Sequence, residues 1–317
     1  GSEMCIRDRS SGFTAGLIYA FIQYVNQLFQ PLIDVTQNFA TLQTSTISAG
    51  RVFEVMDRSD KEPKQAGSRE EIKRGDIRFE HVSFSYDGKQ EVLKDISFEV
   101  KNGETIAFVG HTGSGKSSII NLFMRFYEFD RGQILIDGQD IKDYSQEALR
   151  KSIGLVLQEP FLYHGTIASN IRMYHEELTD EEIRQAAAFV DVADFIESLP
   201  GGYDHPVTER GSTLSTGQRQ LLAFARTIAA QPKILILDEA TANIDQETEE
   251  MIQNSLKKMR QGRTTIAIAH RLSTIQDADC IYVLDKGEII ESGNHDQLIA
   301  LGGTYKKMYD LQAGMMK

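Results

Sequence analysis

The sequence predicts an α/β fold around a parallel sheet, and three stretches carry this prediction. Residues 105–109, Thr-Ile-Ala-Phe-Val, read as an apolar strand that leads through a glycine-rich loop into a helix over 118–126. Residues 234–237, Ile-Leu-Ile-Leu, are apolar at every position, as a central strand buried on both faces would be. A helix over 246–259 then leads to another buried strand over 264–269, which is the strand and helix alternation of an α/β protein.

The loop at 110–117, Gly-His-Thr-Gly-Ser-Gly-Lys-Ser, predicts a phosphate site. Glycine, four residues, then Gly-Lys-Ser is the spacing of a P-loop, in which backbone N–H groups turn toward phosphate oxygens. Lys116 would place its charge on the β- and γ-phosphates, and Ser117 its hydroxyl on Mg²⁺. The positive end of the next helix dipole adds to this attraction. The predicted nucleotide-binding residues here are Gly110, Thr112, Gly113, Ser114, Gly115, Lys116, Ser117 and Ser118.

Composition narrows the class of protein. The chain has 317 residues, enough for about two domains, and its 41% hydrophobic and 25% charged content is that of an ordinary folded protein. The net charge of −12 argues against a broad basic face, so we expect no nucleic acid partner. Cys5 and Cys280 lie far apart without metal-ligand spacing, which fits a reducing compartment.

The N-terminal part predicts a long helix. We expect residues 1–11, charged and without an apolar core, to be an artefactual N-terminus and not a secretory signal. Residues 12–32 are the most hydrophobic long stretch and could span a bilayer, although four Asn or Gln residues between 23 and 30 suit a helix packed in a bundle. Helical spacing continues past Pro31, so 12–57 would form one rod of about 60 Å, its second half projecting into water. A buried helix of a soluble domain is the alternative.

The chain after residue 57 predicts a linker followed by a domain of strands and helices. Residues 58–76, rich in Lys, Glu, Gly and Pro, predict a linker, and alternating apolar positions over 77–100 then predict antiparallel strands. Short strands follow over 132–138 and 153–157. Residues of about 165–230 have helical spacing and few strand formers, which predicts an inserted helical subdomain. A hairpin over 281–291 and two helices from His295 finish the predicted domain, 77–317.

Polar residues follow the buried strands, and ligands collect beyond the carboxyl ends of parallel strands, so these residues should converge. Asp238 would hold Mg²⁺, and Glu239 would be the general base toward the attacking water. His270 would orient that water, and Gln158 would reach the metal or the water. Taken alone, each has a commoner structural role: a strand meeting a turn, a structural histidine or a solvated loop glutamine.

A second anion site is predicted at the start of another helix. Ser215 stands as the N-cap of a helix that runs to about Ala230, and free N–H groups at such a start attract anions. A simply capped helix is the alternative. The candidate residues are Ser215, Thr216, Gly217 and Gln218.

In this order, the motifs resemble those of an ATP-binding cassette (ABC) domain. The stretch 110–117 resembles its Walker A motif, Gln158 the Q-loop, 214–218 the signature, 234–239 the Walker B motif and His270 the H-loop. Tyr86 resembles the aromatic residue that stacks on adenine, 242–245 the D-loop and 208–211 the X-loop of exporters. The resemblance covers 77–317 and implies ATP and Mg²⁺ as ligands, with Lys116, Gln158, Glu239 and His270 in catalysis and Ser117, Gln158 and Asp238 at the metal.

Residues 12–57 resemble the last transmembrane helix and cytoplasmic extension of a multidrug or lipid exporter half-transporter. The resemblance implies a bacterial cell-membrane protein whose nucleotide-binding domain is cytoplasmic and which exports a lipophilic or drug-like substrate. It also implies a head-to-tail dimer with a second half-transporter, in which Ser215 and Gly217 of one chain close over the γ-phosphate held by its partner. The remaining transmembrane helices would lie outside the given sequence.

One residue departs from the family pattern. The signature is usually Leu-Ser-Gly-Gly-Gln, and Thr216 replaces its first glycine, which adds a β-branched side chain where backbone is expected to approach phosphate. Because Glu239 is kept, the chain looks like one half of a heterodimeric bacterial exporter, in which Thr216 would face the weaker ATP site. A homodimer is the alternative.

Two other classes of P-loop protein fit the sequence less well. A soluble ABC ATPase acting on nucleic acid would split its cassette around a long coiled coil, whereas Walker A and Walker B are separated here by about 120 residues without a heptad array. A P-loop kinase or GTPase would need an acceptor site or a guanine-specific loop, and the sequence shows neither.

Overall fold

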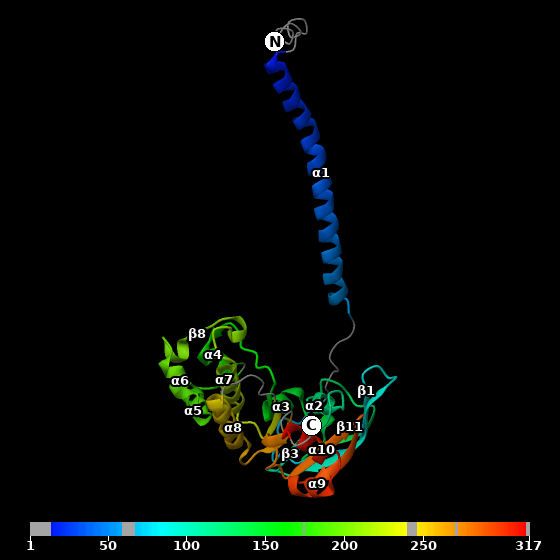
Figure 1. The fold of residues 1–317 in the computed structure, drawn as a ribbon, viewed down its shortest axis with the longest axis vertical. Coiled ribbons are helices and arrows are strands. Elements are labelled where there is room, and N and C mark those ends of the chain that lie inside the picture. Colours follow the sequence, from blue (N-terminus) through cyan, green and yellow to red (C-terminus); the bar gives the residue numbers. More distant parts are fainter. Residues whose placement is uncertain (1–13, 59–66, 174, 240–245, 270–271, 315–317) are drawn as a thin grey trace. The chain divides into compact units, whose positions relative to one another are not determined.

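The computed structural model describes residues 14–58, 67–173, 175–239, 246–269 and 272–314. The chain divides into two units, Gly1–Glu62 and Pro63–Lys317. In its described part the first unit is one helix, and the second holds the predicted α/β domain (Figure 1). The boundary between the units falls inside the predicted linker, 58–76.

The N-terminal unit contains α1, Ala15–Met56, a helix of 42 residues and therefore about 63 Å long. It continues through Pro31, and none of its side chains is buried. Several hydroxyls bond back to the preceding turn; Thr36 Oγ1, for example, donates to the carbonyl O of Leu32 at 2.8 Å. The predicted long helix is confirmed. Among the helices that the structure describes, none combines the length and the apolar character that crossing a membrane requires.

A six-stranded sheet forms the centre of the second unit, in the order β12-β11-β3-β10-β9-β6. Five neighbouring strands are parallel, and β12 closes one edge as the antiparallel partner of β11, which confirms the predicted hairpin. The strands are β3 (Thr105–Val109), β6 (Ile153–Val156), β9 (Ile234–Glu239), β10 (Thr264–Ala269), β11 (Cys280–Asp285) and β12 (Glu288–Gly293).

Both faces of the sheet are buried at its central strands, β3, β9 and β10. In β9, Leu235 and Leu237 pack into one hydrophobic cluster with the helical part of the domain, whereas Ile234 and Ile236 pack into a second cluster with the antiparallel sheet. Successive side chains of a strand point to opposite faces, so a strand covered on both sides must be apolar at every position. This explains the uninterrupted apolar run on which the fold prediction rests.

The antiparallel strands form a separate four-stranded sheet in the order β2-β1-β4-β5. Its strands are β1 (Ile77–Ser85), β2 (Glu91–Val100), β4 (Arg131–Ile136) and β5 (Gln139–Asp140). The helix after the P-loop, α2, spans Lys116–Phe123 and packs its apolar side against this sheet's core cluster. It begins two residues earlier than predicted. The short elements β5, η2 (Ile141–Asp143) and α3 (Gln146–Ser152) were not predicted.

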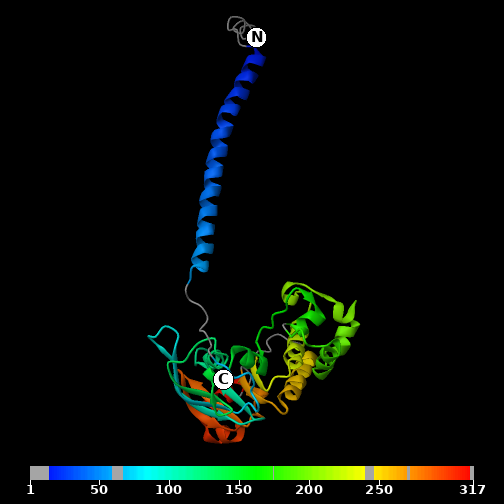
Figure 2. The same cartoon turned by 180° about the vertical axis from the view of Figure 1, so that it is seen from behind.

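The helical subdomain forms a lobe beside the β-rich core in both views (Figures 1 and 2). It consists of β7 (Gly165–Thr166), α4 (Ile167–Arg172), α5 (Asp180–Phe189), α6 (Ala193–Ser198), η3 (Gly202–Asp204), β8 (Pro206–Val207), η4 (Glu209–Gly211) and α7 (Thr216–Ala229). This matches the predicted 165–230 closely. The remaining helices are α8 (Gln246–Arg260), η5 (Leu272–Thr274), α9 (His295–Leu301) and α10 (Thr304–Gln312).

The second half of the predicted linker is part of the folded domain. Ile72 is 1% exposed in the core cluster, and Arg69 bridges to Tyr144. The carboxylate of Asp137 accepts four backbone N–H bonds, at 2.8 to 3.0 Å, from residues 73–76. Burial would raise the pKa of Asp137, but these four bonds outweigh it and hold the pKa below its ordinary value. The linker prediction was therefore wrong for residues 67–76, because a contact with a distant turn is invisible in local composition.

Candidate functional site

The loop between β3 and α2 has the backbone that its glycines predict. Gly115, the N-cap of α2, has φ 109°, and Gly110 has φ 153°. A Cβ on Gly110 would lie 2.3 Å from the carbonyl O of Leu284, and one on Gly115 would lie 2.7 Å from Cδ2 of Leu93. Both positions therefore combine a left-handed backbone with close neighbours, and other residues would disturb the loop.

Lys116 lies inside the loop. Its side chain is largely buried, and Nζ donates to the carbonyl oxygens of Gly110 at 2.7 Å and His111 at 3.0 Å, with Ser114 Oγ at 3.4 Å. Burial lowers the pKa of Lys116, and the nearby charge of Asp238 partly opposes this shift. The ammonium of Lys116 is thus hydrogen-bonded to the P-loop itself, and it interacts electrostatically with Asp238 near the end of β9.

A cavity of about 310 Å³ opens beside the loop. Tyr86 stands at its side, with its hydroxyl 3.1 Å from Ser118 Oγ and accepting from Asn121 Nδ2 at 3.1 Å. The Tyr86 ring also packs edge-on against Tyr127. The structure brings seven of the predicted residues together here, and the full lining is Tyr86, Val92, Thr112, Gly113, Gly115, Lys116, Ser117, Ser118 and Ile268.

Four of the residues that build this cavity were not predicted. Val92 and Ile268 line it, while Asn121 and Tyr127 hold Tyr86 in place. Alternation along β10 could have placed Ile268 on the face toward α2. Val92 has no local signal, because it reaches the loop only through the packing of β2 against α2.

The predicted strand ends converge on one edge of the sheet. In the register of the parallel strands, Ile268 of β10 pairs with Asp238 of β9, and Val156 of β6 pairs with Leu237. Asp238 is partly buried, and Gln158 follows β6 as an exposed residue. Glu239 is the last residue of β9. The side chain of Glu239, all of His270 and the predicted D-loop at 242–245 lie outside the described residues.

The donor types at this edge fit a small hard cation. Ser117 offers a hydroxyl, Gln158 an amide oxygen and Asp238 a carboxylate, and oxygen ligands of this kind suit Mg²⁺. Within the described ranges, no group of three or more His, Cys, Asp or Glu side chains could hold a metal ion. The predicted metal site has only one carboxylate, together with one hydroxyl and one amide, so it is not a group of that kind.

Residues 93–242 match the family model described as ABC transporter. The chain is 71% identical over 310 residues to a Streptococcus pneumoniae protein named as an ABC transporter ATP-binding protein, exp8, covering 98% of the chain and 53% of that protein. It is 52% identical over 300 residues to a Bacillus subtilis protein named as a multidrug resistance ABC transporter ATP-binding/permease protein, YheH, covering 94% and 44%.

This chain carries an ABC transporter domain. A solved bacterial Atm1-family ABC exporter with ATP bound is 40% identical, with a TM-score of 0.75 over 94% of the chain and 52% of that structure. The chain therefore spans about half the length of the relatives that it matches. The expected ABC fold, with its antiparallel sheet, helical subdomain and preceding long helix, is confirmed.

The predicted signature residues lie at the start of α7. Ser215 is its N-cap: Gln218 N donates to Ser215 Oγ at 3.2 Å, and Ser215 N donates to Gln218 Oε1 at 2.9 Å. This reciprocal pair is a capping box, so the predicted cap is confirmed. The described residues around the P-loop cavity do not include 215–218. Within the chain, the structure therefore does not bring the signature residues to the P-loop.

Thr216 is the first residue of α7. Its side chain is exposed, and Oγ1 accepts from Arg219 Nη2 at 3.0 Å, while Arg219 Nη1 donates to the carbonyl O of Leu214 at 2.6 Å. A helical position does not require the left-handed backbone that only glycine adopts easily. The fold of the chain therefore accommodates threonine at this position without backbone strain. The added side chain would instead hinder sterically a ligand or partner chain that approaches the start of α7.

Proposed function

We propose that the chain is the ATP-binding and ATP-hydrolysing part of a bacterial ABC exporter. ATP-driven head-to-tail dimerisation and hydrolysis would drive export of a substrate across the cell membrane, with this domain on the cytoplasmic side. Support comes from the P-loop cavity bounded by Tyr86, together with the sequence relationship to exporters. The acidic net charge of −12 disfavours the nucleic-acid alternative.

The observation that carries this proposal is the separation of the two phosphate-contacting motifs. The P-loop cavity is built by β2, β10 and the start of α2, whereas the signature residues sit at the start of α7 outside it. A second chain can supply the missing signature helix. We infer a second half-transporter as partner, in a heterodimer by preference and a homodimer as the alternative.

In the proposed reaction each residue has a defined task. The loop amides and Lys116 hold the phosphates of ATP, and the ring of Tyr86 packs against its base. Ser117, Gln158 and Asp238 would hold Mg²⁺, which neutralises phosphate charge when bound. Glu239 would accept the proton of the attacking water, and His270 would orient that water against the γ-phosphate.

The long helix α1 supports the membrane part of the proposal. Its apolar side chains, such as Phe21 at 69% and Leu28 at 67% exposure, are exposed in the described part of this unit. In a half-transporter they would pack on the other transmembrane helices, which lie outside the given sequence. The name of the Bacillus subtilis relative, which specifies multidrug resistance, supports a lipophilic or drug-like substrate.

Thr216 supports an asymmetric dimer. It places a side chain at the helix start that would close over the partner's ATP, while Glu239 is kept for this chain's own site. Assembly with an unlike half should therefore raise turnover above that of the purified chain. Equal rates for the chain alone and the mixed dimer would contradict the heterodimer.

Substitution Glu239→Gln tests the proposed function. Removing a general base should lower ATP turnover by about 10²-fold or more. ATP-dependent dimerisation, followed by size-exclusion chromatography, should persist because the P-loop is intact. Glu250→Gln, the same change at an exposed position of α8, is the matched control and should leave turnover unchanged. Normal hydrolysis by Glu239→Gln would exclude Glu239 as the base.

A further inference from the structure

A second and larger cavity, of about 620 Å³, lies at the other end of the sheet. It is bordered by residues that lie just ahead of strands: Asn102 three residues before β3, Lys233 immediately before β9 and Arg263 immediately before β10. The P-loop follows the carboxyl end of β3, and Asp238 lies near the carboxyl end of β9. Because these strands are parallel, the second cavity lies at the sheet edge opposite the ATP site.

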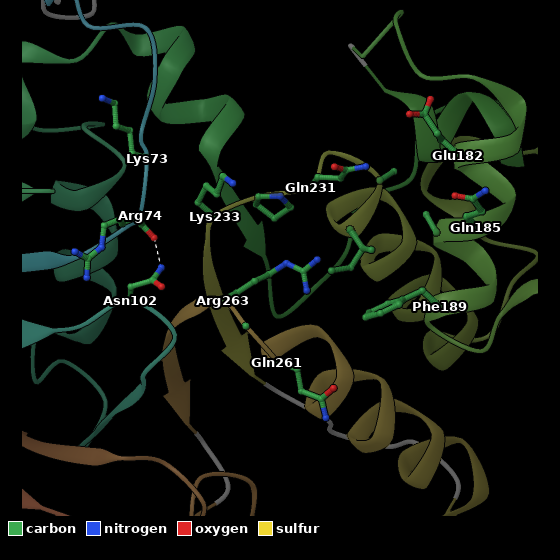
Figure 3. A pocket seen from close by; sticks show the side chains of 15 residues that line it. Lys73, Arg74, Asn102, Glu182, Gln185, Phe189, Gln231, Lys233, Gln261 and Arg263 are labelled. Atoms are coloured by element: carbon green, nitrogen blue, oxygen red, sulfur yellow. Dashed lines mark hydrogen bonds between the residues drawn. The ribbon is translucent and has the colours of Figure 1, made fainter.

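The opposite wall of this cavity comes from the helical subdomain (Figure 3). Helix α5 contributes Gln185 and Phe189, and the C-terminal end of α7 contributes Ile228 and Ala229. The volume is in the range of small-molecule sites, which are about 300–1,000 Å³. The cavity therefore joins the β-core to the helical subdomain at a place that ATP chemistry does not use.

Two cations, the half-buried Arg263 and the exposed Lys233, line the cavity beside the strand starts. In Figure 3, Arg263 extends from the core toward Phe189, whereas the charged ends of Lys73 and Arg74 point away. Arg263 Cζ lies 5.9 Å from the centre of the Phe189 ring.

The charge of Arg263 is poorly compensated. Burial lowers the pKa of its guanidinium, and Nη1 donates to the carbonyl O of Met259 at 3.0 Å. In the part of the chain that the structure describes, neither Arg263 nor Lys233 has a carboxylate partner. A partly buried guanidinium with unused N–H groups favours an anion.

The remaining polar groups suit the same ligand. Amide side chains of Asn102, Gln185, Gln231 and Gln261 also line the cavity. Asn102 Nδ2 already donates to the carbonyl O of Arg74, and Gln185 Nε2 donates to Glu181 Oε1 at 3.2 Å, so each of these two amides has one further N–H to offer. The carboxylate of Glu182, also on the wall, already accepts from the N–H and the hydroxyl of Thr179, both at 2.8 Å, as the cap of α5. The acid on this wall is thus engaged in its own helix.

We propose that this cavity binds a small phosphate-bearing anion, with Arg263 and Lys233 as its charged ligands. The bound anion would connect α5 to the strands of the core. Helix α7 runs from the signature residue Thr216 to this cavity, so occupancy would restrain the helical subdomain that carries the signature. The site does not depend on ATP hydrolysis.

The test uses inorganic pyrophosphate as the probe and a Lys116→Ala chain, which removes the phosphate-binding ammonium of the P-loop. Calorimetric titration should show saturable binding. Adding Lys233→Gln and Arg263→Gln should weaken it by about tenfold or more, because two charge-assisted hydrogen bonds are lost. Amide hydrogen exchange in α5 should slow on binding in the Lys116→Ala chain and should not slow in the pocket variant.

The control carries Lys89→Gln and Lys257→Gln on the Lys116→Ala background, which changes the net charge equally at exposed positions outside the cavity. Its affinity for pyrophosphate should match that of the parent. No saturable binding, equal weakening in both variants, or protection confined to the P-loop would each overturn the proposal. If the double substitution lowers the melting temperature sharply, Lys233→Gln alone carries the test, with a smaller weakening expected. Failure of Glu239→Gln to abolish turnover would leave this result unaffected.

Discussion

Helices α2 and α7 both begin where phosphate contacts were predicted, yet their first turns are built differently. The N-cap of α2 is Gly115, in a left-handed conformation without a side-chain cap. The N-cap of α7 is Ser215, which exchanges two hydrogen bonds with Gln218. The first N–H groups of any helix lack partners within the helix, so the two starts solve the same problem in different ways.

The two helix starts therefore differ in which N–H groups remain available to a ligand. At α2, no side chain competes for the first N–H groups, which leaves them open to an anion, whereas the Lys116 ammonium is bonded to the loop carbonyls. At α7, the chain satisfies one of these groups itself, so the helix is stable without a ligand. A phosphate that approaches this helix start can accept from the Ser215 hydroxyl and from the N–H groups of Thr216 and Gly217, whereas the N–H of Gln218 is already bonded to Ser215 Oγ.

The largest effect should come from breaking the α2 side of the comparison. In Gly110→Ala, the new Cβ would meet the carbonyl O of Leu284 at 2.3 Å in a left-handed backbone, at a cost of about 1–3 kcal/mol. ATP affinity, measured by fluorescent nucleotide titration, should fall by roughly tenfold or more. Gly113→Ala has φ 82° but no neighbour within 4 Å, so it should lose less. Equal losses would show that steric contact is irrelevant.

A smaller effect is expected at α7. Ser215→Ala removes the N-cap and should cost about 1 kcal/mol of folding free energy. For a domain of this size, that lowers the melting temperature by about 2–4 °C. Nucleotide affinity of the single chain should not change, because Ser215 does not line its own P-loop cavity. Ser215→Asn, which keeps a good cap, should restore the melting temperature, and an unchanged melting temperature in Ser215→Ala would contradict the capping role.

The smallest effect on the isolated chain should come from Thr216→Gly. The side chain is exposed and loses one bond from Arg219, so the folding free energy should fall by at most about 1 kcal/mol. ATP affinity of the single chain should remain that of the parent, while turnover of the assembled transporter should change. Altered affinity in the single chain would show that Thr216 acts within its own subunit.

The sequence predicted best what depends on local pattern. The apolar run of β9 requires burial on both faces, and the P-loop spacing requires a strand, a loop and a helix in that order. Ser215 was recognisable as a cap because its neighbours, including Gln218, follow the rules of helix starts. The strand ends could be brought together because parallel strands share one direction.

What remained hidden depends on contacts between distant segments. Helix α3 has only seven residues, Gln146–Ser152, and is too short to show the apolar repeat that would have identified Ser145 as its N-cap. Val92 reaches the P-loop cavity only because β2 packs against α2. The basic cavity was also invisible, since Lys233 and Arg263 are ordinary loop residues until the sheet sets their strands side by side.

The carboxylate of Asp137 has a mechanical consequence. Four consecutive N–H groups, from Lys73 to Asp76, end on its two oxygens just before β1 begins. Tension on the chain ahead of residue 67 would first load the bridge of Arg69 to Tyr144 and the buried side chain of Ile72, and then these four bonds, before it could peel β1 from the sheet. Because the pKa of Asp137 is lowered, its carboxylate stays charged at pH values at which an ordinary carboxyl group begins to be protonated. The four hydrogen bonds therefore weaken only when the pH falls below that range. One side chain, just after β4, thus ties the segment before β1 to the antiparallel sheet, so that a pulling force on this segment is transmitted to β4 as well as to β1.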